Sequence, residues 1–199
     1  MAVTISGDIT AIVGDTLTPW SFFIEDLNGT VPDLDDYDSV EFHALDDSAC
    51  PATDLVAWTS SNVTVQPTKT FTSDTATGIK SLYSVNHGLK VGMQLKLSTT
   101  TTLPTGLNNT QRFFVVRVNG HNFWVCKQRT GTPIEITDSG TGTHSFEILG
   151  HVQYQPQAGD VTTAGTYKAE IRIEESGKYE TLPGDASKIP LYIVQDACD

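Results

Sequence analysis

The chain has 199 residues, of which 38% are hydrophobic and only 18% are charged. This balance indicates a folded protein and favours strands and turns over long helices. The formal net charge of −12 argues against nucleic-acid binding, because neutralising phosphates requires Lys and Arg. No apolar run approaches the roughly 18 to 20 residues of a membrane span. The first ten residues lack the basic and apolar regions of a signal peptide, so we expect the chain to fold in a cytoplasm.

Short runs of alternating apolar and polar residues begin near the N-terminus, and no segment has the length and periodicity of a helix. In "DSVEFHALD" (38–46), the apolar residues at 40, 42 and 44 face one way and the polar residues at 41 and 43 face the other. Further strands are expected over 54–60, 62–67, 167–174 and 189–194. Trp20, Phe22 and Trp58 are candidates for the core, or for anchoring a partner.

The middle of the chain differs from its flanks in charge. Residues 70–149 hold seven Lys/Arg against four Asp/Glu, a net charge of +3, whereas the remainder holds five against twenty, a net charge of −15. A Thr/Ser-rich linker is expected over 68–78. These features predict an antiparallel β-sandwich made of residues 1–68 and 150–199, interrupted in one loop by a small β domain of residues 69–149.

The stretch "SVNHGLKVGMQLKLSTTTTLPTGL" (84–107) raises the possibility of a phosphate-binding loop, but it lacks the Gly-Lys-Ser/Thr that would grip phosphate. We expect its glycines at 88 and 92 to shape turns. We expect residues 89, 91, 93, 95 and 97 to form one apolar strand face. Pro104 and Gly106 should then turn the chain toward the next strand.

The five histidines, at 43, 87, 121, 144 and 151, show no metal-binding spacing. We expect His87 to order a turn through hydrogen bonds and the other four to lie on the surface. His87 and His144 could approach one another if the insertion closes into a barrel. The weak candidates for a metal site are four acidic residues that calcium could bind: Asp33, Asp35, Asp36 and Asp38.

Three isolated cysteines, at 50, 126 and 198, form neither a metal knuckle nor a complete disulfide framework, so packed free thiols are expected. An intermolecular disulfide through Cys198 is the alternative. No nucleophile signature and no pair of carboxylates placed to share a proton is present, so we expect no catalytic residues, no cofactor and no enzymatic activity.

The flanking segments resemble the immunoglobulin-like N-terminal domain of phage baseplate upper proteins. The resemblance covers about 110 residues and rests on the order of its landmarks more than on any one of them. Those landmarks are Gly14-Asp15-Thr16, Asp26 to Gly29 to Leu34, Val40 and Phe42, Gly165-Thr166-Tyr167, Glu170, and Thr181 to Pro183. The resemblance implies an immunoglobulin-like sandwich.

The insertion resembles a small β module that recurs in phage tail and other virion proteins. Its landmarks are His87-Gly88-Leu89, Gly92, Leu103 to Leu107, Phe114-Val115-Val116, Asn122-Phe123, and Asp138 to His144. Such modules are likened to a small β domain of ubiquitin-activating enzymes, a likeness of fold that gives Cys126 no catalytic role.

Together the resemblances imply a non-enzymatic structural component of a tailed-phage virion, assembled in the host cytoplasm. Its expected partners are tail, baseplate, neck or capsid subunits and further copies of itself, without nucleic acid or membrane. The alternatives are a capsid decoration protein, or a glycan- or receptor-binding module on the particle surface. In the latter case, exposed Tyr83, Phe113 and Trp124 would form the contact platform.

Overall fold

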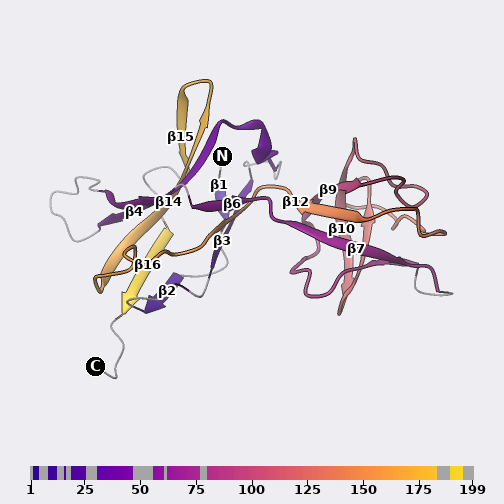
Figure 1. Cartoon of the computed structure of the whole chain (residues 1–199), viewed down its shortest axis with the longest axis horizontal. Coiled ribbons are helices and arrows are strands. Elements are labelled where there is room, and N and C mark those ends of the chain that lie inside the picture. The colour runs from indigo at the N-terminus through magenta and orange to yellow at the C-terminus, as the bar shows by residue number, and fades with distance from the viewer. Residues whose placement is uncertain are drawn as a thin grey trace. The chain divides into compact units, whose positions relative to one another are not determined.

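The computed structural model describes residues 2–4, 9–12, 16, 19–25, 31–46, 56–60, 62–76, 80–182 and 189–194. Regular structure in these residues is β-strand apart from one short 3-10 helix, η1 (Leu34–Asp36). The chain divides into two compact units, Met1–Gln66 with Gly150–Asp199, and Pro67–Leu149 (Figure 1). The expected all-β class, a sandwich that carries an inserted barrel, is confirmed. The expected boundary at 68/69 lies two residues beyond the observed one, and the expected boundary at 149/150 coincides with it.

The first unit is a sandwich of two sheets. One sheet has the order β1 (Ala2–Thr4), β3 (Trp20–Glu25), β13 (His151–Tyr154), β6 (Val63–Val65). The other has the order β2 (Ile9–Ile12), β16 (Ile189–Val194), β14 (Gly165–Glu175), β4 (Ser39–Asp46), β5 (Val56–Ser60), and β15 (Lys178–Leu182) also pairs with β14. Pairing between described strands is antiparallel except for β16 with β2. The two-residue turn between β14 and β15 has positive φ at Ser176 and Gly177, as a tight hairpin requires.

The sandwich core is aromatic and follows the expected alternation. The ring of Phe42 stacks on that of Tyr154, with centroids 4.2 Å apart, and the Trp20 ring meets both edge-on. Phe22 is fully buried beside them. The expectation that Trp20 and Phe22 belong to the core is therefore confirmed, whereas the side chain of Trp58 lies outside the described residues.

Gln66 holds the two chain segments that lead to the inserted unit. Its backbone N–H donates to the carbonyl of His151 over 2.7 Å. Its side-chain oxygen accepts from the backbone N–H groups of Leu34 and Gly150, and its amide donates to the Asp33 carboxylate. Because the two ends of the insertion are fixed side by side, the sandwich can accommodate it without opening its core.

The second unit is a closed barrel in which neighbouring strands are antiparallel. Its strand order is β10 (Arg112–Asn119), β11 (Asn122–Cys126), β8 (Ser81–Tyr83), β7 (Thr68–Asp74), β12 (His144–Ile148), β9 (Gln94–Thr99). Closure leaves no open sheet edge, and in a barrel this small the side chains themselves fill the interior. The largest fully buried interior side chains are Leu82, Leu95, Leu97, Phe113, Phe123 and Phe146.

Two local expectations for the barrel are corrected. The Thr/Ser-rich segment expected to be a linker forms β7, because buried Phe71 alternates with polar neighbours as a half-buried strand requires. The strand expected to carry an apolar face from residue 89 begins only at Gln94, so only Leu95 and Leu97 of that face lie in it. Gly92 has φ +96° and Met93 N–H donates to the carbonyl of Lys90, so a turn precedes the strand and leaves Val91 65% exposed.

Candidate functional site

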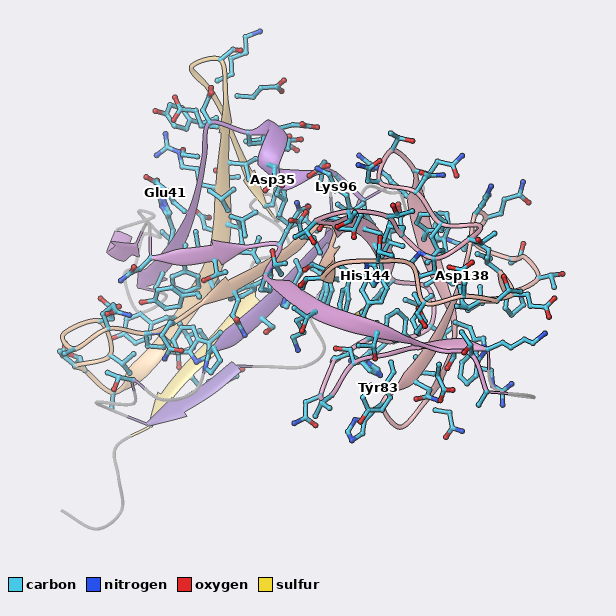
Figure 2. The ribbon with its side chains drawn as sticks, turned by 45° about the vertical axis from the view of Figure 1, so that its right-hand side comes forward. Asp35, Glu41, Tyr83, Lys96, Asp138 and His144 are labelled. Atoms are coloured by element: carbon cyan, nitrogen blue, oxygen red, sulfur yellow. The ribbon has the colours of Figure 1, made fainter. Side chains whose placement is uncertain are left out.

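A groove with a volume of about 1130 Å³ lies along β7 of the barrel. It is lined by residues 68–73 of β7, by residues 83–86, at and after the end of β8, and by residues 139–144, before and at the start of β12. Figure 2 shows Tyr83 and His144, which come from the strands that flank β7. We call this feature the β7 groove.

The lining of the β7 groove combines uncharged polar groups with apolar surface and carries little charge. Among the described residues that line it, Lys69 supplies the one ammonium group and none is a carboxylate. Most of its side chains are hydroxyls: Thr68, Thr70, Thr72, Ser73, Ser84, Ser139, Thr141 and Thr143. This set donates and accepts hydrogen bonds without selecting one sign of ligand charge.

The outer face of β7 carries a row of three threonines, at 68, 70 and 72, because alternate residues of a strand point the same way. All three are exposed. Thr72 pairs directly across the sheet with Tyr83, which places the phenol beside the end of the row. Tyr83 as a residue is 37% exposed, so it offers a partly open aromatic side chain at the rim.

The rim around Tyr83 is fixed by the turn between β10 and β11. The His121 ring meets the Tyr83 ring edge-on, with centroids 5.9 Å apart. Ser84 N–H donates to the carbonyl of His121, and Asn86 N–H donates to the His121 ring. Lys69 adds a third tie, because its ammonium donates to the carbonyls of Asn86 and His87 at 2.7 and 3.1 Å. The rim is therefore ordered before any ligand arrives.

The opposite side of the groove depends on the motif "D-x-G-x-G-T-H". The Thr105 hydroxyl, followed by the backbone N–H groups of Gly140 and Thr105, lowers the pKa of Asp138 below its ordinary value. Gly140 and Gly142 have φ +59° and +85°, and a Cβ on either would collide with the strand-end segment at residues 100–103. The motif residues are therefore those that this loop needs in order to fold.

The two motif histidines also serve the fold. His144 is buried, and its ring nitrogens bond the Thr99 hydroxyl and the Ser139 carbonyl, each at 2.9 Å. His87 is buried too, and its Nδ1 accepts from the N–H of Leu89, so Nε2 carries the proton donated to the Gly120 carbonyl. Burial lowers the pKa of His87. His87 thus orders a turn, as expected.

The expectation that the other four histidines lie on the surface is wrong except for His121. His144 is buried as described above. His43 lies between two carboxylates, with its nitrogens 3.1 Å from Glu41 and 3.9 Å from Glu170. His151 stacks on the Phe23 ring with centroids 4.6 Å apart.

The expected aromatic platform is corrected for two of its three members. Phe113 is fully buried, because its pairing with Leu95 directs it into the barrel. Trp124 is only 9% exposed, and the Arg117 guanidinium covers its ring at 4.5 Å. Of the three, only Tyr83 remains open to a ligand.

The calcium hypothesis for Asp33, Asp35, Asp36 and Asp38 is also corrected. Asp33 accepts from the Gln66 amide, and Asp38 accepts from the N–H of Ser176. No group of three or more His, Cys, Asp or Glu side chains in the described ranges is placed to hold a metal ion.

Cys126 is a buried free thiol whose Sγ–H donates to the Gln128 carbonyl, as expected of a packed cysteine. Cys50 and Cys198, including the proposed intermolecular disulfide, lie outside the described residues. No helix in the described part of the chain is long and apolar enough to cross a membrane.

No family model and no curated protein matches this chain. Among solved structures, it is similar to one described as a family 123 glycoside hydrolase from Clostridium perfringens. The two share 10% sequence identity with a TM-score of 0.23, over 95% of this chain and 23% of that one. A likeness this low carries no argument about fold or function.

Proposed function

We propose that this protein is a non-enzymatic structural component of a tailed-bacteriophage virion. Its sandwich docks on neighbouring tail, baseplate or neck subunits, and its barrel is the displayed module. In the assembled particle, the protein forms a homo-oligomer and contacts other virion proteins, without nucleic acid or membrane. The proposal rests on the resemblances of the two segments to phage virion domains.

The observation that carries the proposal is that the motif residues of the barrel hold its loops in place. His87, Asp138 and His144, on which the resemblance depends, all make hydrogen bonds that hold barrel loops. These bonds help a small closed barrel to fold. Residues with such a role are expected to recur wherever the same module is used. This supports a shared module and gives these side chains a role that needs no chemistry.

The charge of the sandwich indicates the kind of surface it meets. Burial, followed by the nearby Glu175, Glu180 and Asp36 carboxylates, raises the pKa of Tyr37. We call the exposed carboxylates Asp36, Glu175 and Glu180, which all act on Tyr37, the acidic tip. The segment after η1 is joined to the β14–β15 hairpin here, because Asp38 accepts from the N–H of Ser176. A basic surface on a neighbouring subunit would match this tip and fix the register of docking.

Immunogold labelling of purified particles tests the location. An epitope inserted between Arg129 and Thr130, both exposed on the barrel, leaves the barrel strands intact. We expect gold at the tail, baseplate or neck. Gold spread over the capsid lattice would overturn that placement in favour of a decoration protein, and particles without label, from a host that makes the tagged protein, would overturn the virion assignment.

Charge reversal tests the docking surface. The double substitution Asp36→Lys and Glu180→Lys should lower the amount of protein per particle at least tenfold, whereas the neutral Asp36→Asn and Glu180→Gln pair should have a smaller effect. Both variants should fold normally, because exposed substitutions of this kind change the free energy of unfolding by about 0.5 kcal/mol or less. Equal occupancy of the wild type and the reversed variant in quantitative immunoblots would show that the tip is not the contact.

A further inference from the structure

We propose that the β7 groove is a binding site for an uncharged oligosaccharide. The inference goes beyond docking in the particle, since it assigns a ligand to the barrel and does not depend on which virion subunits the sandwich contacts. It rests on the hydroxyls that line the groove, the open tyrosine at its rim, and its low charge.

The groove presents hydrogen-bonding groups that the fold does not use. The side chains of Thr70, Thr72 and Asn86 make no hydrogen bond to the described part of the protein, although their neighbours His87 and His144 are fully bonded. The two histidines therefore hold the barrel together, whereas Thr70, Thr72 and Asn86 leave their hydrogen-bonding groups available to a ligand. The outward set matches a ligand whose own surface is rich in hydroxyls.

Tyr83 gives the groove a surface for the apolar face of a sugar ring. Sugar rings present C–H groups on their faces and hydroxyls around their edges, so they pair with an aromatic ring beside polar side chains. The Tyr83 phenol is amphipathic in the same sense. Its cross-strand neighbour Thr72 would meet the hydroxyl edge of a ring stacked on Tyr83.

The size and order of the groove suit a short chain of sugars. From Thr68 to Thr72, the strand runs roughly 13 Å, which spans more than one sugar ring. The groove volume of about 1130 Å³ lies slightly above the roughly 300–1,000 Å³ typical of small-ligand sites. The ties from His121 and Lys69 pre-order the rim, which lowers the entropy lost on binding.

The charge and lining of the groove argue against other ligand classes. A nucleic acid would need several Lys or Arg to neutralise its phosphates, and the lining holds only Lys69. An extended peptide would need apolar pockets for alternate side chains, whereas the open side chains on β7 are threonines. An uncharged oligosaccharide needs neither.

The test is a glycan array probed with the whole protein, followed by calorimetric titration of the oligosaccharides that bind. We expect saturable binding of uncharged glycans that changes less than twofold between 50 and 500 mM salt. Tyr83→Ala should weaken it at least tenfold, Tyr83→Phe less than twofold, and Thr72→Val about fivefold. Tyr179→Ala, an exposed tyrosine of the sandwich, and Thr132→Val, an exposed threonine outside the groove, should leave binding unchanged.

Three outcomes would overturn the inference. One is no binding of any glycan by folded protein, and another is binding that survives Tyr83→Ala in a variant whose thermal unfolding is normal. The third is binding restricted to sulfated or phosphorylated glycans, lost in high salt and in Lys69→Gln, which would make the groove an anion site. None of these moves the gold label on the particle, so failure here and failure of the virion role remain distinguishable.

Discussion

The sandwich and the barrel are both built from antiparallel strands, yet different interactions hold each together. The sandwich relies on an aromatic core in which Trp20, Phe42 and Tyr154 meet across two sheets. The barrel adds a set of loops clamped by side chain to backbone hydrogen bonds from His87, Asp138 and His144. One unit therefore depends mainly on the burial of aromatic rings, whereas the other depends also on a few specific loop contacts.

The largest expected effect tests whether the two units fold independently. Phe42→Ala removes the ring that stacks on Tyr154 and should cost the sandwich about 4 kcal/mol. Hydrogen-exchange mass spectrometry should then show faster exchange in β4 and β14 with the barrel strands unchanged. Phe123→Ala is the matched change in the barrel interior and should give the reverse pattern. Equal loss of protection in both units, from either variant, would show that they unfold as one body.

The next largest effect tests the loops of the barrel that His87, Asp138 and His144 hold, which we call the loop clamp. Gly140→Ala places a Cβ against the carbonyl of Thr102 at a φ of +59° and should cost about 3 kcal/mol, because strain and collision act together. Gly120→Ala is the control, since φ is +61° there and nothing lies near the added methyl. It should cost about 1 to 2 kcal/mol, the strain alone. If urea denaturation gave the same loss of unfolding free energy for both variants, the contact between the new Cβ and the Thr102 carbonyl would contribute nothing.

Local alternation was enough to predict sandwich strands such as β4 and β14, but not the faces of the barrel strands. In β14, Tyr167, Ala169, Ile171 and Ile173 are buried as the pattern predicts. In "RFFVV" of β10, however, either phenylalanine could face inward. The choice is made by pairing Phe113 with Leu95 of β9, a contact between segments far apart in sequence.

The position of Trp124 could not be predicted for a related reason. A bulge between Val115 and Arg117 shifts the register of β10 against β11 and brings Arg117 opposite Trp124. Such a shift reverses which face the following residues occupy. The β7 groove was missed likewise, since threonines near residue 70 meet a loop near residue 140 only once the barrel closes. The sequence signal that could have found it is the alternation "TKTFT".

The smallest of the three effects is the pH dependence of barrel stability, which His87 of the barrel brings about. His87 has a lowered pKa in the folded protein, so below about pH 6.5 the unfolded chain takes up a proton more readily than the folded one. Its contribution to stability is complete above that pH and declines as the pH falls toward the lower, folded-state value. Burial, which penalises the charged imidazole, is the main origin of this loss. Protonating Nδ1 would also break the bond that it accepts from Leu89 N–H.

His87→Asn tests this pH dependence. It should cost about 2 kcal/mol at pH 7.5 through the lost hydrogen bonds. It should also give a shallower fall in barrel stability between pH 7 and pH 5 than the wild type, measured by denaturation followed at barrel amides. The two proteins are otherwise identical, so the difference between the two curves belongs to His87. Parallel curves would mean that His87 takes up its proton without loss of the turn.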